Sequence, residues 1–314
     1  VIGGLGFSPD GQRLALTLNS ATSPSDVYVV ELATATLVRW TQSEVGGLDA
    51  SRFRAPELVR FPTFDEVDGK PRTIPAFYYR PEGDGPFPVV VSIHGGPESQ
   101  AFPTFNPSTQ FLLNELKVAV LVPNVRGSAG YGKNYLQLDN GLLRKDSVKD
   151  IGALLDWIGG RPELDAERVG VMGGSYGGYL TMAAMAFTDE FKVGINIFGV
   201  TNWVRTLESI PAWWESFRES LYAELGDPAK DGERLRRISP VFHGDKVKKP
   251  VLVVQGANDP RVLQVESDEM VAAIRAQNVP VEYVLFPDEG HGFLKKENRI
   301  KAQEAYLAFL QKYL

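Results

Sequence analysis

The sequence predicts an α/β protein: an eight-stranded, mostly parallel sheet with helices on both faces, preceded by a short antiparallel β-meander. Two observations predict this fold. From about residue 55 onward, apolar runs of strand length alternate with amphipathic stretches of helix length, as in a parallel sheet covered by crossover helices. Before that point, apolar and polar residues alternate between turn-forming sequences, which predicts antiparallel strands. We therefore expect a β-meander over residues 1–50 and one α/β domain over residues 51–314.

The composition limits the class of protein and of partner. With 314 residues, 43% apolar and 23% charged, the chain is that of an ordinary globular protein, and its apolar runs are far shorter than the ~20 residues that cross a membrane. A net charge of −6 without a basic cluster argues against nucleic acid and anionic membrane surfaces as partners. The absence of cysteine excludes thiolate chemistry, and three histidines argue against a metal cluster, so we expect no metal and no cofactor.

The first 50 residues carry no visible leader and have a pattern of their own. The chain starts at Val1 without an initiator methionine or a signal peptide, so we expect a cytoplasmic location and a piece of a longer protein. The turn Ser8-Pro9-Asp10-Gly11, followed by a strand and then by SDVYVVEL, is similar to one blade of a β-propeller. No second copy of this pattern follows. Either further blades lie upstream, or the meander packs as an isolated appendage.

Eight apolar runs bounded by turn-forming residues predict the strands of the main sheet. They are Glu57–Phe64, Arg72–Arg80, Phe87–His94, Val118–Asn124, Arg168–Gly173, Val193–Phe198, Val251–Gly256 and Val281–Phe286.

Between these strands, apolar residues that recur at intervals of three and four predict helices. They are Pro107–Leu116, Ser147–Ile158, Gly178–Phe187, Leu263–Gln277 and Lys295–Leu314. Asp146 and Ser147 stand where an N-cap would begin the second of these helices. The segment 203–226, which contains Trp213 and Trp214, predicts a helical excursion between strands, a place where such folds often contact substrates.

The most informative junction is RVGVMGGSYGGYLTMAAMAF, residues 168–187. It combines a buried strand, a turn with one serine and a helix of small residues. The pattern G-x-S-x-G alone is weak, but in this context it predicts a nucleophile elbow around Ser175, the strained turn of an α/β-hydrolase fold. Gly173 and Gly177 supply the room that such a turn needs.

A nucleophilic serine needs a base, and on this fold the base follows the last strand. His291 lies there, in PDEGHGF, between two glycines that leave its ring free to reach Ser175. The other two histidines are poorly placed. His94 belongs to the earlier HGGP turn, and His243 lies in a polar connector, so we assign His243 no chemistry.

The base in turn needs an acid that orients it. Asp259, in the loop ANDPR after the strand VLVVQG, lies between Ser175 and His291 in the order that this fold uses. Asp288 and Glu289 are closer to His291 in the sequence, but such near neighbours in a loop rarely hold a ring at the required angle. We therefore predict Asp259 as the acid.

Attack by Ser175 on a carbonyl group would create an oxyanion that needs preorganised donors. The backbone N–H of Tyr176 is the first candidate. A backbone N–H of the HGGP turn, from Gly96, and the hydroxyl of Tyr131 in RGSAGYG are two further candidates, and the sequence leaves both open.

Taken in order, HGGP, RGSAGYG, GGSYGG, ANDPRV and EGHGF resemble the prolyl oligopeptidase family of serine peptidases, particularly its acylaminoacyl-peptidase-like branch. The resemblance covers about residues 55–314. It implies a catalytic α/β-hydrolase domain, and it implies that residues 1–50 are a remnant, the last blade, of the N-terminal β-propeller that filters substrates by size in this family. The dipeptidyl branch reads a free amine with a glutamate pair from its propeller, which is not evident in this sequence, so we expect blocked or internal substrates.

The resemblance also implies the roles of individual residues. Ser175, Asp259 and His291 correspond to the catalytic triad, and Tyr176 to an oxyanion donor. Branches of the family differ over whether the residue at Gly96 or at Tyr131 is the other donor. Arg261, two residues after the acid, is similar to the family's arginine that holds a carbonyl of the substrate backbone.

Together these observations predict a serine hydrolase that cleaves peptide or N-acyl-amino-acid bonds of short peptides through an acyl-enzyme. Two alternatives differ in class. A carboxylesterase would use the same triad on small acyl esters. A non-catalytic binding module would require a missing triad member, and none is missing. The sequence leaves a homo-oligomer open, through exposed edge strands or through residues 1–50.

Overall fold

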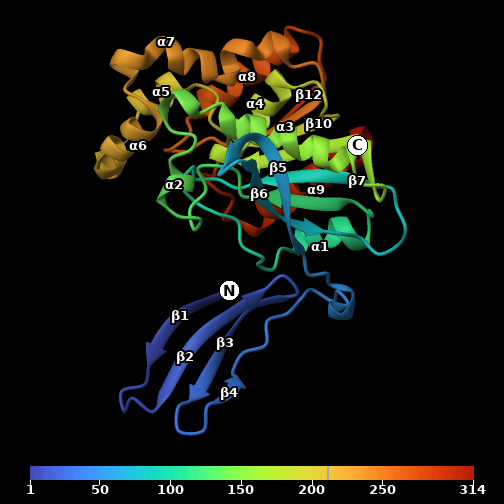
Figure 1. The fold of residues 1–314 in the computed structure, drawn as a ribbon, viewed down its shortest axis with the longest axis vertical. Helices are drawn as coiled ribbons and strands as arrows, with labels where there is room; N and C mark the ends of the chain where they lie inside the picture. Colours follow the sequence, from blue (N-terminus) through green and yellow to red (C-terminus); the bar gives the residue numbers. More distant parts are fainter. Residues whose placement is uncertain (211) are drawn as a thin grey trace. The chain divides into compact units, whose positions relative to one another are not determined.

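The computed structural model describes residues 1–210 and 212–314 of the chain (Figure 1). By their internal contacts these residues form two compact units. The first consists of Val1–Leu58, Phe77–Gly83 and Phe102–Val120, and the second of Val59–Ala76, Asp84–Ala101 and Leu121–Leu314. The domain boundary predicted after residue 50 stays a prediction.

Residues 1–50 form the predicted meander. Four antiparallel strands lie in the order β1-β2-β3-β4, with bounds Ile2–Phe7, Arg13–Ser20, Ser23–Glu31 and Thr36–Arg39. The predicted turn after β1 is present, since the Gly11 N–H donates to the Ser8 carbonyl at 2.8 Å. Beyond β4, the buried carboxylate of Asp26 accepts hydrogen bonds from Thr41 Oγ1 (2.8 Å) and Ser43 N (2.9 Å) and pairs with Arg39, which fastens this segment to β3.

The main sheet has the predicted eight strands, in the order β12-β11-β10-β9-β7-β8-β6-β5. Their bounds are β5 Glu57–Val67, β6 Lys70–Tyr79, β7 Phe87–Ile93, β8 Ala119–Pro123, β9 Leu164–Gly174, β10 Val193–Ile197, β11 Val251–Gly256 and β12 Val281–Phe286. Neighbouring strands from β7 and β9 through to β12 pair in parallel. Parallel pairing brings the carboxyl ends of these strands to one edge of the sheet, where the loops after them meet.

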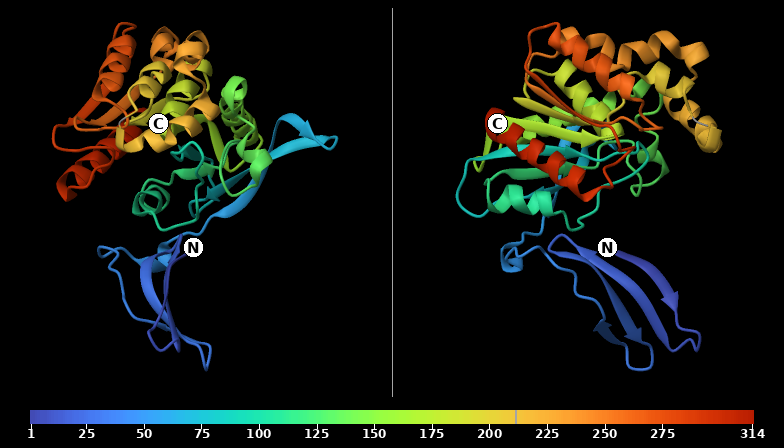
Figure 2. Two further views of the ribbon diagram at one scale, coloured as in Figure 1. Left: turned by 90° about the vertical axis from the view of Figure 1, so that its left-hand side faces the viewer. Right: turned by 180° about the vertical axis from the view of Figure 1, so that it is seen from behind.

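Helices cover the sheet on both faces, as predicted; Figure 2 shows α9 on the opposite side of the sheet from α4 and α8. The helices expected from the sequence are α1 Pro107–Asn114, α3 Asp146–Gly159, α4 Tyr176–Phe187, α8 Gln264–Arg275 and α9 Lys296–Tyr313. Short helical turns lie at η1 Ala50–Arg52, α2 Lys133–Leu136 and η2 Gly141–Leu143. Among the residues described, no helix is long and apolar enough to span a membrane.

The start of α3 differs from the prediction that Asp146 and Ser147 cap it. The N-cap is Lys145, which makes no side-chain capping bond, and Asp146 is already helical. The chain enters α3 directly from η2, with Lys145 in a helical conformation, so no extended capping residue precedes the helix. The Ser147 hydroxyl donates instead to the Arg144 carbonyl at 2.8 Å.

The predicted helical excursion lies between β10 and β11. It consists of α5 Trp203–Glu208, η3 Ala212–Phe217, α6 Arg218–Leu225, α7 Pro228–Ile238 and η4 Pro240–Lys246. Asn202 caps α5 by accepting a hydrogen bond from the Arg205 N–H, and Asp227 caps α7 by accepting one from the Ala229 N–H. The excursion provides most of one wall of the cavity described below.

Candidate active site

Ser175 occupies a strained turn between β9 and α4. Its φ of 58° and ψ of −120° place it in the left-handed region, which residues with a side chain rarely adopt. The turn is possible because its neighbours lack side chains. A Cβ at Gly177 would lie 2.2 Å from the Ile93 carbonyl oxygen, and one at Gly173 would lie 2.4 Å from the Gly177 carbonyl oxygen. The structure therefore has the turn geometry of the nucleophile elbow that the sequence predicts.

Three side chains predicted from the sequence lie together at this turn. The hydroxyl of Ser175 is 3.0 Å from His291 Nε2, and His291 Nδ1 is 2.7 Å from Asp259 Oδ2. Asp259 is nearly fully buried, and His291 is partly buried. Because an ionised carboxylate only accepts, Nδ1 carries the ring proton and donates it to Asp259, which leaves the Nε2 lone pair to accept the hydroxyl of Ser175.

Residues after β10 and β11 hold Asp259 and His291 in place. The second carboxylate oxygen of Asp259 accepts hydrogen bonds from the backbone N–H groups of Arg261 (2.8 Å) and Val262 (3.0 Å). The ring of Phe198 packs against the imidazole of His291 at a centroid distance of 4.8 Å. Asp259 and His291 are thus each fixed by a group other than the partner side chain.

The rival residues of the sequence analysis have other contacts. Glu289 accepts hydrogen bonds from the backbone N–H groups of Leu294 and Lys295, at the start of α9. Asp288 is exposed and contacts the side chains of Lys295 and Asn298.

The two other histidines lie outside this arrangement. His94 Nε2 is 2.9 Å from the Ser128 hydroxyl, its Nδ1 is 2.6 Å from the Gly95 carbonyl, and burial lowers its pKa. His243 contacts the Arg237 carbonyl at 3.0 Å through Nε2.

The candidate oxyanion donors lie in different places. Tyr176 is the first residue of α4, so its backbone N–H has no intrahelical acceptor and is free for a ligand. Gly96, with a φ of +147°, lines the same cavity as Ser175. Tyr131 is not among the described residues that line this cavity, and its hydroxyl accepts a hydrogen bond from Asn124 Nδ2 at 2.8 Å.

Beside Ser175 lies a cavity of about 290 Å³ with mostly apolar walls. Its lining includes Val200, Trp203, Leu207, Ile210, Leu221 and Leu225, with Thr206 as a polar member. Trp214 and Arg261 also line it, and the guanidinium carbon of Arg261 lies 5.4 Å from the centroid of the Trp214 indole, within the range of a cation–π contact. No acidic side chain within the described part of the chain forms an ion pair with Arg261.

Sequence reasoning missed the buried polar residues behind the cavity. Tyr176 was predicted only for its backbone N–H, but its hydroxyl contacts the guanidinium of the fully buried Arg144 at 2.9 Å. Glu266 on α8 accepts hydrogen bonds from the N–H groups of Thr201 and Asn202, which lead into α5. No local pattern marks these residues, because their partners are distant in the sequence.

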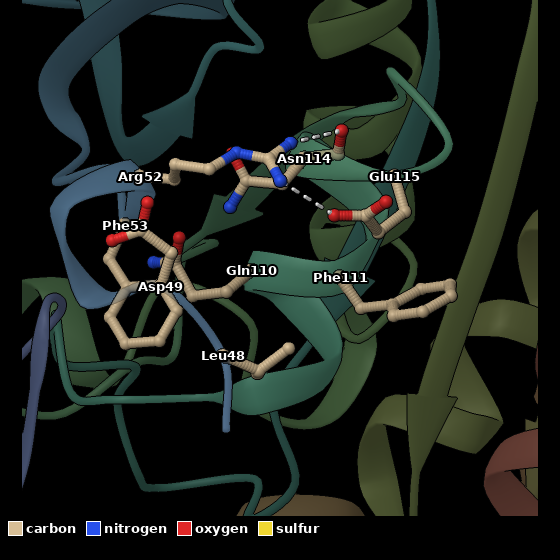
Figure 3. A pocket seen from close by; sticks show the side chains of 8 residues that line it. All are labelled: Leu48, Asp49, Arg52, Phe53, Gln110, Phe111, Asn114 and Glu115. Atoms are coloured by element: carbon tan, nitrogen blue, oxygen red, sulfur yellow. Dashed lines mark hydrogen bonds and ion pairs between the residues drawn. The ribbon is translucent and has the colours of Figure 1, made fainter. Parts of the chain in front are cut away.

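A second cavity, in the first compact unit, is much smaller (Figure 3). It has about 30 Å³ and lies between η1 and α1, where the Arg52 guanidinium donates to the Asn114 carbonyl (3.3 Å) and pairs with Glu115 (3.3 Å). This volume suits about one water molecule. In the part of the chain that the structure describes, no group of three or more His, Cys, Asp or Glu side chains is arranged to hold a metal ion.

Comparison with known proteins agrees with the fold and shows the family. The family model described as the prolyl oligopeptidase family matches residues 103–314. The chain belongs to the prolyl oligopeptidase family. Over 220 residues it is 42% identical to dipeptidyl aminopeptidase BIII of Pseudoxanthomonas mexicana, a match that covers 69% of this chain and 32% of that protein.

Two further proteins are similar to this chain. Over 221 residues the chain is 31% identical to the acylamino-acid-releasing enzyme of Rattus norvegicus, covering 67% of this chain and 29% of that enzyme. The crystal structure of puromycin hydrolase matches with a TM-score of 0.89 and 26% identity, over 98% of this chain and 46% of that one. The chain thus spans less than half the length of these relatives.

Proposed function

We propose that this chain carries the catalytic site of a serine peptidase that cleaves peptide or N-acyl-amino-acid bonds through an acyl-enzyme. One observation carries the proposal. The hydroxyl of Ser175, on a strained turn, is linked by two hydrogen bonds through His291 to the buried Asp259, beside a mostly apolar cavity. Membership of the prolyl oligopeptidase family supports it.

In this proposal the residues act in two half-reactions. Ser175 Oγ attacks the carbonyl carbon while its proton passes to His291 Nε2, and Asp259 stabilises the imidazolium cation. The backbone N–H groups of Tyr176 and Gly96 bind the oxyanion. The C–N bond then breaks, His291 returns the proton to the leaving amine, and a water molecule repeats the sequence to release the acid. Arg261 holds a carbonyl of the substrate backbone.

The cavity favours a substrate with a large apolar side chain on the acyl side of the cleaved bond. An enclosed apolar cavity of roughly 150 Å³ is enough to bind benzene, and the cavity beside Ser175 has about 290 Å³. Complete burial of a phenylalanine side chain, relative to leaving it exposed, stabilises the complex by roughly 1.5–3 kcal/mol. We therefore propose N-acyl peptides with phenylalanine or another large apolar residue before the cleaved bond as substrates.

The test compares hydrolysis of N-acetyl-phenylalanine p-nitroanilide with that of its p-nitrophenyl ester by the full chain. Loss of anilide cleavage in Ser175→Ala would support the peptidase. Ester cleavage alone would indicate a carboxylesterase, and failure of folded protein to react with a fluorophosphonate would favour a binding module. Because one relative is named a dipeptidyl aminopeptidase, an unblocked dipeptidyl p-nitroanilide belongs in the same experiment.

Several expectations stay predictions: that residues 51–314 are the catalytic domain, that residues 1–50 are a last propeller blade, that the location is cytoplasmic, and that the chain forms a homo-oligomer.

A further inference from the structure

A cluster of buried polar side chains lies behind the proposed oxyanion site, outside the triad. The guanidinium of Arg144 donates through Nη1 to Asp139 Oδ2 (2.6 Å) and to the Tyr176 hydroxyl (2.9 Å), and through Nη2 to Glu224 Oε1 (2.8 Å). The Tyr176 hydroxyl donates to Asp139 Oδ2 at 3.2 Å. The side chain of Arg144 has no exposed surface, and those of Asp139 and Glu224 are 1% and 8% exposed. We call these four residues the Arg144 cluster.

The cluster joins three segments that are distant in the sequence. Asp139 and Arg144 lie on either side of η2, Tyr176 begins α4, and Glu224 lies in the last turn of α6. Two of these segments belong to the site. Tyr176 presents the proposed oxyanion donor on its backbone, and α6 carries Leu221 and Leu225 in the cavity wall. One guanidinium therefore contacts both the oxyanion residue and the helix that shapes the side-chain cavity.

The cluster has a composition that stability alone does not explain. Burial raises the pKa of Asp139 to about 6 and that of Glu224 to about 7, although Arg144 opposes both shifts. A buried ion pair is often no more stabilising than apolar residues of similar volume. A planar guanidinium, however, fixes its partners in defined directions. An oxyanion donor needs such a fixed direction, because its contribution to catalysis depends on preorganisation.

We propose that Arg144 is a positioning residue that couples the α6 wall of the cavity to the backbone N–H of Tyr176. The inference rests on the proposed function. A large side chain that packs against Leu221 and Leu225 also restrains Glu224, and through Arg144 it restrains the ring of Tyr176. A substrate that fills the cavity is therefore held at the same time as the oxyanion donor is aligned.

The experiment compares Arg144→Met with Arg234→Met. Arg234 is a matched control, because it donates to the carbonyls of Gly141 (2.8 Å) and Leu225 (2.9 Å), beside the cluster, and makes no contact with Tyr176 that the structure describes. Both variants are assayed on the p-nitrophenyl esters of N-acetyl-phenylalanine and N-acetyl-alanine. Each kcat is divided by the number of sites that a fluorophosphonate titrates, which removes the effect of unfolded protein.

For Arg144→Met we expect kcat per titrated site to fall by roughly 10- to 100-fold with both esters, since misplaced groups in a site cost about this much. We expect KM to rise for the phenylalanine ester alone, because only that side chain reaches α6. Arg234→Met should keep kcat per titrated site within about twofold of the wild-type value, because Arg234 makes no described contact with Tyr176. A merely structural role of Arg144 would reduce the number of titrated sites and leave both constants per site unchanged, and that result would overturn the inference.

A second variant covers the case in which Arg144→Met does not fold. Glu224→Met removes the acceptor of Arg144 Nη2 at a similar side-chain volume, so KM for the phenylalanine ester should rise while KM for the alanine ester stays constant. Unchanged constants for Glu224→Met would overturn the coupling. A wild-type chain that cleaves the esters but no anilide would contradict the peptidase proposal and leave this comparison readable, whereas a chain without ester cleavage or labelling would overturn both.

Discussion

At the scale of single residues, the candidate site depends on which atom of His291 is left free. The Nδ1–H donates to Asp259 Oδ2 at 2.7 Å, so Nε2 accepts from the hydroxyl of Ser175 at 3.0 Å. Asp259 cannot rotate freely, because its Oδ1 accepts two backbone hydrogen bonds, from the N–H groups of Arg261 and Val262. The backbone of one loop therefore determines the tautomer of a ring on another.

This arrangement predicts a large effect of Asp259→Asn. The asparagine carbonyl should keep the two backbone N–H bonds, which turns its NH₂ group toward His291 Nδ1. The ring must then carry its proton on Nε2, where it can no longer accept the proton of Ser175. We expect kcat for N-acetyl-phenylalanine p-nitroanilide to fall by about 10⁴-fold, as the same change does in a serine protease triad, with circular dichroism unchanged.

Asp288→Asn is the control for that prediction. Asp288 is closer to His291 in the sequence, but it is exposed and contacts Lys295 and Asn298. The kcat of Asp288→Asn should stay within about twofold of the wild-type value. If Asp288→Asn caused the larger loss, the assignment of Asp259 as the orienting acid would be wrong.

At the scale of helices and strands, the elements that the sequence predicts correctly are those that a local pattern of apolar and turn-forming residues determines. The bounds of β11 and β12, Val251–Gly256 and Val281–Phe286, match the predicted strands because an apolar run ends at residues that break strands. The three residues proposed as the triad were predicted in the same way, since each follows a strand. The predicted N-cap of α3 was wrong. The chain enters α3 directly from η2, so no extended residue is available to cap the helix.

The residues that support the site were not predictable from local pattern. Arg144 and Glu224 are 80 positions apart, and Glu266 lies 65 positions from Thr201, its hydrogen-bond partner. A charged residue in an amphipathic helix ordinarily faces water. These groups are buried only because the excursion packs against the sheet and α8. No single segment of the sequence predicts that packing.

Glu266 gives a prediction at this scale. Its carboxylate accepts hydrogen bonds from Thr201 N (2.8 Å) and Asn202 N (3.0 Å), which lead into α5, and from Thr206 Oγ1 (2.6 Å) within that helix. Glu266→Ala leaves these donors buried without an acceptor, so we expect the free energy of unfolding in urea to fall by roughly 3 kcal/mol. Because Trp203 and Thr206 line the cavity, KM for the phenylalanine ester should rise as well.

Two matched variants separate the lost acceptor from a general loss of charge on α8. Glu266→Gln keeps an acceptor oxygen for the backbone N–H groups and should retain most of the stability. Glu269→Ala removes a partly exposed carboxylate that pairs with Arg205, so it should change the free energy of unfolding by less than about 1 kcal/mol. A larger loss in Glu269→Ala than in Glu266→Ala would contradict the role of Glu266 in holding α5.

At the scale of the whole molecule, the candidate site belongs to one of the two compact units. Ser175, Asp259 and His291, and every described residue that lines the cavity beside them, lie in the second unit. The meander and the exposed segment after β4 belong to the first. The chemistry of Ser175 should therefore not depend on covalent continuity of the first 50 residues with the rest of the chain.

This expectation predicts the outcome of limited proteolysis. Glu44 lies in an exposed segment without regular structure, between β4 and η1, so a glutamate-specific protease should cut there early in the full chain. The cut chain should react with a fluorophosphonate at a rate within about twofold of the intact chain, because no group that activates Ser175 has been removed. Glu44→Gln, which resists cleavage at this position, identifies the cut. Loss of labelling after cleavage in the wild-type chain but not in Glu44→Gln would mean that the meander helps to form the site, and the assignment of the site to the second unit alone would be wrong.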